Sequence, residues 1–317
     1  MTVTTPAPTR TSASITVPSA VPPAGGFAIP WLPAGRTVTI DGRGEFFIRE
    51  HRHQDATRPT VILLHGWTAS SDLQFFTAYE ALAEECSFVG IDHRGHGRGL
   101  RTPTEFSLED AADDAAAVLR NLGETQVVAI GYSMGGPIAM LLARRHPDLV
   151  SGLITQATAL EWNGTLRERL QWRWLPVMES ALRSRIAGRF MKRFLEKMLA
   201  DGHGLKQYIP WLRGESQRAD IGTVKEAGKA LATYDATAWA GNLDVPAGML
   251  ITTQDRLVKP RKQRALAMAL GADVRVIATD HLGPWEQPDQ FSSATIELLS
   301  LVSLIGSPAT SGAPTES

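Results

Sequence analysis

Ser133 lies in a pattern that suits a nucleophile, with Gly131 two residues before it and Gly135 two residues after it. The apolar run 127–130 before this pattern is typical of a buried parallel strand, and helical spacing follows it up to His146. A strand, a sharp turn and a helix would lift the serine hydroxyl clear of the backbone, and the glycines remove side chains where strand and helix meet. The pattern predicts that Ser133 attacks an electrophilic carbon.

A serine hydroxyl becomes a good nucleophile only when a base takes its proton, and a histidine oriented by a carboxylate can supply that base. His281 follows the apolar run 274–277, and Asp255 follows the apolar run 249–252. The C-terminal ends of parallel strands meet at one edge of a sheet, so both side chains are expected beside Ser133. The candidate catalytic residues are therefore Ser133, Asp255 and His281, in the chain order serine, acid, histidine.

Other carboxylates near these strands compete for the role of the acid. Asp244 precedes its strand and would face the opposite edge of the sheet, and Asp280 adjoins the histidine too closely to orient it easily. Glu161 follows the strand pattern 150–155 and lies at the same edge as the serine. Glu161 therefore stays an alternative acid.

The oxyanion of a tetrahedral intermediate needs hydrogen-bond donors. One expected donor is the backbone N–H of Met134, at the positive end of the helix that follows the serine. The other is the backbone N–H of Trp67, after the apolar run 60–64, where Gly66 lets the backbone approach a substrate closely. The residues expected to contact the substrate are Gly66, Tyr132, Trp162 and Trp285.

These side chains need a sheet whose strand ends converge. Helical spacing at 73–83, 107–122 and 261–270 separates runs that have strand character. The strand runs are 37–40, 46–49, 60–64, 88–91, 127–130, 150–155, 248–252 and 274–277. Alternating strands and helices predict an α/β fold, with a mostly parallel eight-stranded sheet and helices on both of its faces.

The alternation stops between residues 157 and 242, where no strand pattern occurs and helical spacing dominates. We expect an α-helical cap at 157–242, inserted into a core domain that is formed by residues 31–156 and 243–304. Residues 1–30 and 305–317 are rich in Thr, Ser, Pro and Ala, which predicts disordered tails.

Composition and charge exclude several classes of protein. The 317 residues carry a net charge of −1, so no nucleic-acid partner is expected. Cys86 is the only cysteine, so no intrachain disulfide can form. No run approaches the roughly 20 apolar residues that span a membrane, and residues 1–10 lack the features of a secretory signal. We therefore expect a cytoplasmic protein, and its oligomeric state stays open.

Basic and apolar residues recur together at 166–197 of the expected cap. This pattern suits a weak contact with a membrane surface, a cover over an apolar pocket, or helices that pack on the core with arginines in solvent. The choice among the three stays open at the level of the sequence.

Five motifs resemble those of the α/β-hydrolase fold superfamily, in its cap-bearing bacterial branch. They are His65-Gly66 for the oxyanion loop, the D-x-R-G-x-G loop at 92–97, the serine turn at 131–136, the acid loop at 255–260 and the H-x4-E-x-P-x2-F ending at 281–291. The likeness covers roughly residues 36–304 and is weakest in the cap. Two positions depart from the family pattern: Asp280 stands where a glycine is usual, and the turn 253–255 lacks the common glycine.

The resemblance implies a serine hydrolase that cleaves a carboxylic ester through an acyl-enzyme, as carboxylesterases and lipases do, with an apolar acyl or alcohol group. A serine nucleophile excludes the aspartate-based chemistry of haloalkane dehalogenases and epoxide hydrolases. Thioesterase, amidase, C–C bond hydrolase and perhydrolase chemistry stay open because they use the same side chains, and so does a binding protein with little turnover. The resemblance implies no metal and no organic cofactor.

Overall fold

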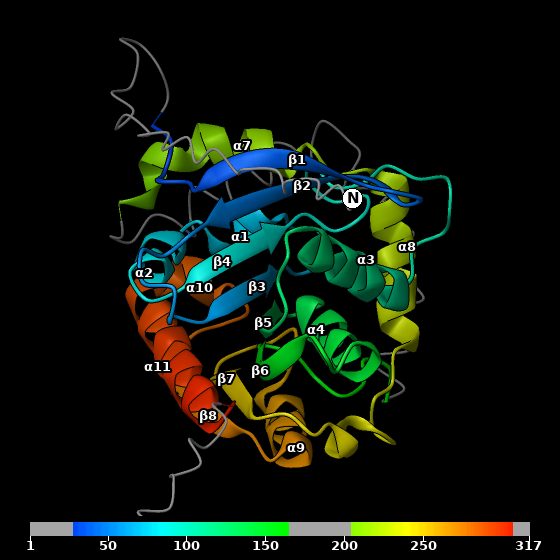
Figure 1. Ribbon diagram of the computed structural model, residues 1–317. Coiled ribbons are helices and arrows are strands. Elements are labelled where there is room, and N and C mark those ends of the chain that lie inside the picture. The colour runs from blue at the N-terminus through cyan, green and yellow to red at the C-terminus, as the bar shows by residue number, and fades with distance from the viewer. Residues whose placement is uncertain (1–27, 165–203, 307–317) are drawn as a thin grey trace, which may run out of the picture.

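A computed structural model describes residues 28–164 and 204–306 (Figure 1). Its centre is an eight-stranded sheet with the spatial order β1-β2-β4-β3-β5-β6-β7-β8. The pairs β1–β2 and β2–β4 are antiparallel, and all other neighbouring strands are parallel. The strands are β1 (Ala34–Ile40), β2 (Gly44–His51), β3 (Thr60–Leu64), β4 (Ser87–Ile91), β5 (Val127–Tyr132), β6 (Val150–Gln156), β7 (Ala247–Thr252) and β8 (Asp273–Ile277). The mostly parallel eight-stranded sheet expected from the sequence is confirmed.

Helices cover both faces of this sheet, as expected (Figure 1). They are α1 (Ser71–Phe75), α2 (Tyr79–Ala83), α3 (Leu108–Asn121), α4 (Gly135–Arg145), α7 (Ile209–Ser216), α8 (Ile221–Thr233), α9 (Pro260–Leu270), α10 (Gly283–Glu286) and α11 (Pro288–Gly306). Apolar side chains of α3, α4, α8 and α9 join one core cluster, and those of α1, α2, α7 and α11 join the other. The sheet is thus buried on both sides, which explains the continuous apolar runs of its central strands.

Local sequence accounts for several element ends. Ser107 accepts a hydrogen bond from the Asp110 N–H at 3.0 Å and so begins α3 as an N-cap. The helical spacing at 73–83 is divided in the structure between two short helices, α1 and α2, with a break at 76–78. The break lets the Thr77 hydroxyl donate to the Pro284 carbonyl at 2.8 Å, so a tertiary contact with α10 overrides the helical spacing.

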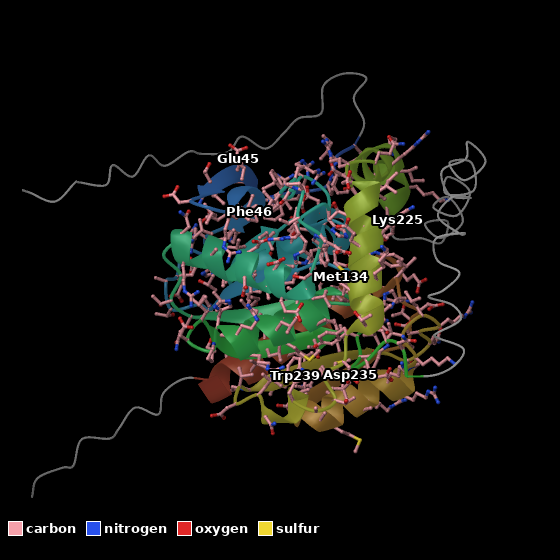
Figure 2. The ribbon with its side chains drawn as sticks, turned by 90° about the vertical axis from the view of Figure 1, so that its right-hand side faces the viewer. Glu45, Phe46, Met134, Lys225, Asp235 and Trp239 are labelled. Carbon is pink, nitrogen blue, oxygen red and sulfur yellow. The ribbon has the colours of Figure 1, made fainter. Side chains whose placement is uncertain are left out.

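The described part of the segment between β6 and β7 is helical, with α7, α8 and the 3-10 turns η1 (Leu205–Tyr208) and η2 (Ala240–Asn242). The Trp67 indole donates to the Val224 carbonyl of α8 at 2.7 Å. Helix α8 therefore crosses the edge of the sheet where β3 and β5 end (Figure 2). The basic pattern at 166–197 lies outside the described residues, and the expected domain boundaries and tails stay predictions.

The described helices also bear on the expected absence of a membrane span. Over residues 28–164 and 204–306, none of them is both long enough and apolar enough to cross a lipid bilayer.

Candidate active site

Ser133 sits at a sharp turn between β5 and α4, with a φ of 53°. Residues other than glycine rarely adopt this left-handed backbone conformation. It persists only where the surrounding structure imposes it. Here the Ser133 N–H donates to the Gln156 carbonyl at 2.8 Å, which ties the turn to the end of β6. The start of α4 also packs closely against the end of β3. A Cβ on Gly135 would lie 1.9 Å from the Leu64 carbonyl oxygen, so this position after the serine accepts only glycine.

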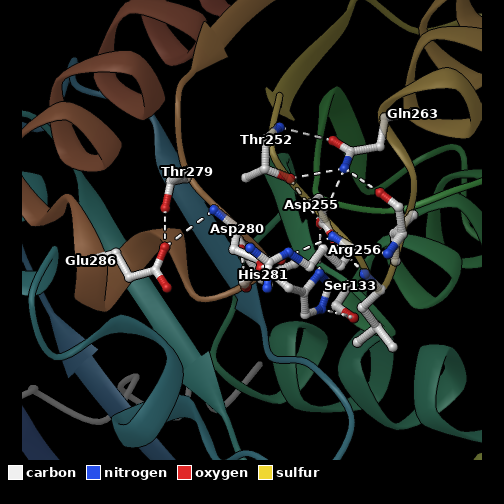
Figure 3. A network of polar contacts seen from close by, with 12 residues as sticks. Ser133, Thr252, Asp255, Arg256, Gln263, Thr279, Asp280, His281 and Glu286 are labelled. Atoms are coloured by element: carbon white, nitrogen blue, oxygen red, sulfur yellow. Dashed lines mark hydrogen bonds and ion pairs between the residues drawn. The ribbon is translucent and has the colours of Figure 1, made fainter. Parts of the chain in front are cut away.

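His281 joins the serine to a carboxylate (Figure 3). Its Nε2 lies 3.0 Å from Ser133 Oγ, and its Nδ1 lies 2.8 Å from Asp255 Oδ2. Because a carboxylate can only accept, the proton belongs on Nδ1, which leaves Nε2 to accept the proton of the serine hydroxyl. The structure thus brings together all three side chains that the sequence indicated, from the ends of β5, β7 and β8.

Hydrogen bonds hold both oxygens of the buried Asp255 carboxylate. Oδ1 accepts from the backbone N–H groups of Leu257 at 2.9 Å and Val258 at 2.8 Å. Oδ2 accepts from the Thr252 hydroxyl at 2.8 Å, in addition to facing the imidazole. Such a carboxylate has one orientation, and it points at the histidine.

The rival acids have other partners. Glu161 pairs with the Lys262 ammonium at 3.0 Å. Asp280 accepts backbone hydrogen bonds from Arg256 at 2.9 Å and from His281 at 2.8 Å, so its carboxylate binds the main chain of two loops instead of the imidazole ring. Asp244 lies before β7 begins, at the other end of that strand.

The two residues expected to supply oxyanion donors, Met134 and Trp67, belong to the two segments next to the serine. Met134 is fully buried and directly precedes the first residue of α4. The loop that carries Trp67 lies against the serine, because a Cβ on Gly66 would be 3.3 Å from Ser133 Cβ. A Cβ would be crowded here, so glycine suits this position, and the loop backbone lies beside the serine side chain.

A neutral histidine supports the same loop. His65 Nε2 accepts from the His93 N–H at 3.0 Å, which places the ring proton on Nδ1, 2.8 Å from the Gly66 carbonyl oxygen. Complete burial holds the pKa of His65 well below its usual range. His65 therefore shapes the loop as an uncharged side chain.

The residues expected to contact the substrate all touch other parts of the protein. The Tyr132 hydroxyl donates to the His281 carbonyl at 2.7 Å, and burial raises the phenol pKa well above its usual range, so it stays a neutral donor. Trp162 belongs to the core cluster that α3 and α4 share. The Trp285 indole donates to the Leu73 carbonyl at 2.8 Å. Tyr132 thus connects the serine turn to the histidine loop.

Sequence reasoning missed Thr252 and Gln263, two buried polar side chains around Asp255 (Figure 3). Gln263 lies on the same side of α9 as the buried Leu266 and Ala267, three and four residues later. A glutamine on an apolar helix face is a signal that could have identified it, because buried amides need partners. Among the described residues, no group of three or more His, Cys, Asp or Glu side chains is arranged to hold a metal ion.

Comparisons with known proteins agree with this architecture. The chain is 30% identical over 223 residues to a pimeloyl-acyl-carrier-protein methyl ester esterase of Neisseria meningitidis. This alignment covers 67% of this chain and 82% of that protein. Its alignment with the 2-(acetamidomethylene)succinate hydrolase of Mesorhizobium japonicum is 29% identical and covers 30% of this chain but only 34% of that protein. Several other curated relatives are likewise matched over only about a third to two fifths of their length.

Solved structures share the fold. An esterase from Exiguobacterium antarcticum superposes with a TM-score of 0.71 at 19% identity, covering 84% of this chain and 100% of that one. The model of the α/β hydrolase fold family matches residues 59–288, which is more than half of the chain. With the eight-stranded sheet and the serine turn at its centre, the chain belongs to the α/β hydrolase fold family.

Proposed function

We propose that this protein is a serine hydrolase that cleaves a carboxylic ester through an acyl-enzyme. The observation that carries the proposal is the unbroken series of contacts from Ser133 Oγ through the His281 imidazole to the Asp255 carboxylate. In this arrangement His281 Nε2 takes the serine proton while Oγ attacks the ester carbonyl carbon. Asp255 holds the imidazole in the required tautomer and stabilises the imidazolium that forms.

The remaining steps use the same groups. The backbone N–H groups of Met134 and Trp67 are proposed to bind the oxyanion, with the positive end of α4 adding to the attraction. The imidazolium gives its proton to the leaving alkoxide, so the alcohol departs and Ser133 keeps the acyl group. Water then attacks the acyl carbon with His281 as base, which releases the acid and restores the hydroxyl. No metal and no organic cofactor take part in these steps.

Aromatic side chains near the histidine loop favour a substrate with an apolar group. Phe76 packs against Tyr208, Trp211 and Trp285, with ring centroids 6.1, 5.3 and 6.2 Å apart. Tyr208, Trp211 and Trp285 stay partly exposed, and such surfaces commonly bind apolar ligand groups. The names of the Neisseria methyl ester esterase and the Exiguobacterium esterase also support an ester as the substrate.

The test compares wild type with Ser133→Ala on p-nitrophenyl acetate, butyrate and octanoate. We expect wild type to hydrolyse at least one ester and Ser133→Ala to lose about 10³-fold or more in kcat. A fluorophosphonate should label wild type and spare Ser133→Ala. Equal ester hydrolysis by both proteins would contradict the proposal. Tight binding of an ester without turnover by wild type would instead indicate a binding protein.

A further inference from the structure

Gln263 on α9 is fully buried and contacts three points of the loop that carries Asp255 (Figure 3). Its Nε2 lies 2.8 Å from Thr252 Oγ1, 3.1 Å from Asp255 Oδ2 and 2.7 Å from the Val258 carbonyl oxygen. Its Oε1 accepts the Thr252 N–H at 3.0 Å. One side chain therefore forms hydrogen bonds with the end of β7, with the Asp255 carboxylate and with the end of the acid loop.

The chemistry of this position suits an amide. Two N–H hydrogens serve three acceptors, so the one not given to Val258 is shared between Thr252 Oγ1 and Asp255 Oδ2. The Thr252 hydroxyl keeps its own hydrogen for Asp255 Oδ2. Buried polar groups need such full pairing, because an unpaired group keeps the whole penalty of desolvation.

We propose that Gln263 is a positioning residue, which orients the Asp255 carboxylate toward His281 and so sets the rate of the chemical step. This inference rests on the proposed serine hydrolase function. Gln263 acts through Asp255 and touches no reacting atom. Its loss would remove one donor from Oδ2 and the link between α9 and the acid loop, so the carboxylate would be held less firmly against the imidazole. The serine and the proposed oxyanion donors would stay in place.

The first test is Gln263→Met, which keeps the length of the side chain and removes every hydrogen bond. Leu266→Ala is the matched control, since Leu266 is equally buried on α9 and its aliphatic side chain makes no hydrogen bond. We expect Gln263→Met to lower kcat about 10-fold or more with little change in KM, and Leu266→Ala to lower the Tm while keeping kcat. An equal fall of kcat in both variants would show a merely structural role and overturn the proposal.

The second test is the pH profile of Gln263→Glu. A carboxyl group here would face the Asp255 carboxylate at about the same position as Nε2, and two carboxylates so close share a proton. The singly protonated pair can still form a hydrogen bond between the two side chains, and the doubly ionised pair cannot. We expect kcat of Gln263→Glu, relative to kcat of wild type at the same pH, to fall as pH rises. Parallel profiles would contradict the proposal. This variant also carries the test if Gln263→Met does not fold.

A third readout does not depend on turnover. The Nδ1–H proton of His281, held by Asp255, should give a downfield ¹H signal that is absent from His281→Ala. We expect this signal in wild type and in Leu266→Ala, and a shifted or lost signal in Gln263→Met. An unchanged signal in Gln263→Met would overturn the positioning role. If no ester is hydrolysed by wild type while the signal still depends on Gln263, the proposed function fails and the positioning role stands.

Discussion

At the residue scale, the partners of two acids decide which of them can serve His281. Asp255 faces the imidazole Nδ1, while Glu161 is neutralised by Lys262. Both acids follow strands at the same edge of the sheet, so their positions along the chain could not separate them. The separation comes from the side chains that each carboxylate meets in the folded protein.

Asp255→Asn is expected to lower kcat for ester hydrolysis by roughly 10³–10⁴-fold, with little change in KM. An amide NH₂ facing Nδ1 favours the tautomer with the ring proton on Nε2, which cannot accept the serine proton. Glu161→Gln is the matched control and should keep kcat near that of wild type. Steady-state kinetics of both variants check this expectation. A nearly unchanged Asp255→Asn beside an inactive Glu161→Gln would move the role to Glu161.

At the scale of elements, the serine turn between β5 and α4 is held by close contacts with the ends of β3 and β6. The start of α4 passes the end of β3 so tightly that Gly135 has no room for a methyl group. Helix α7 is joined to the core by charge, because Arg98 bridges Asp72 of α1 at 3.2 Å and Glu215 of α7 at 2.6 Å. The contact between α4 and β3 positions the serine turn, and the ion pairs of Arg98 position α7, which carries Trp211.

Gly135→Ala is expected to prevent folding or to lower the Tm severely, because the new Cβ would lie 1.9 Å from the Leu64 carbonyl oxygen. Gly214→Ala in α7 is the control, since its Cβ would meet no heavy atom within 4 Å in the described structure. Alanine favours a helix over glycine by up to about 1 kcal/mol, so this control should keep or raise the Tm. Thermal unfolding of both variants decides, and a wild-type Tm for Gly135→Ala would contradict the argument.

Glu215→Ala should destabilise the protein by about 2 kcal/mol or more, because it removes a buried partner of Arg98. The matched control is Glu297→Ala, which breaks a pair with Arg275 in which Glu297 is 57% exposed, and it should change stability by less than about 1 kcal/mol. Urea unfolding gives both values. Equal losses would mean that the buried network contributes no more than a surface pair.

At the scale of the whole molecule, three histidines from the loops after β3 and β4 are buried together: His65, His93 and His96. The ring of His65 lies 4.1 Å from that of His93 and 5.4 Å from that of His96, measured between centroids. Burial lowers the pKa of His93 to about 3 and of His96 to about 4, and the pKa of His65 shifts in the same direction. Nearby, burial raises the pKa of Asp92 to about 6. These groups make stability depend on pH.

The protein should lose stability as pH falls from about 6.5 toward 4, because the unfolded chain takes up protons on these histidines before the folded protein can. Asp92 has the opposite effect on stability, since its raised pKa favours the folded state below about pH 6. The three histidines together outweigh Asp92, so the protein should lose stability overall. We expect the Tm to fall by several degrees between pH 7 and pH 5.

His93→Phe supplies the control for this pH dependence. Neither ring nitrogen of His93 has a hydrogen-bond partner within the described part of the chain, so phenylalanine keeps the packing and removes one titration. The Tm of His93→Phe should fall less between pH 7 and pH 5 than that of wild type. Equal slopes for the two proteins would show that the buried histidines do not cause the effect.

The sequence by itself determined the eight strands, the glycines around Ser133 and the order of the serine, acid and histidine loops. These features depend on local causes: apolar periodicity, the conformational freedom of glycine and turns at strand ends. Strands that are buried on both faces show continuous apolar runs, and parallel strands bring their ends to one edge. The fold and the place of the candidate site could therefore be predicted from neighbouring residues alone.

Only the tertiary structure decided which side chains meet. It paired His281 with Asp255, gave Glu161 to Lys262, and used Tyr132 to hold the histidine loop. It also placed Gln263 behind the acid. Each of these contacts depends on the packing of whole elements, and His281 is 148 residues from the serine that it contacts. Local patterns bring these side chains to one edge of the sheet but do not settle their final partners, because burial and hydrogen-bond pairing depend on how the sheet and its helices come together.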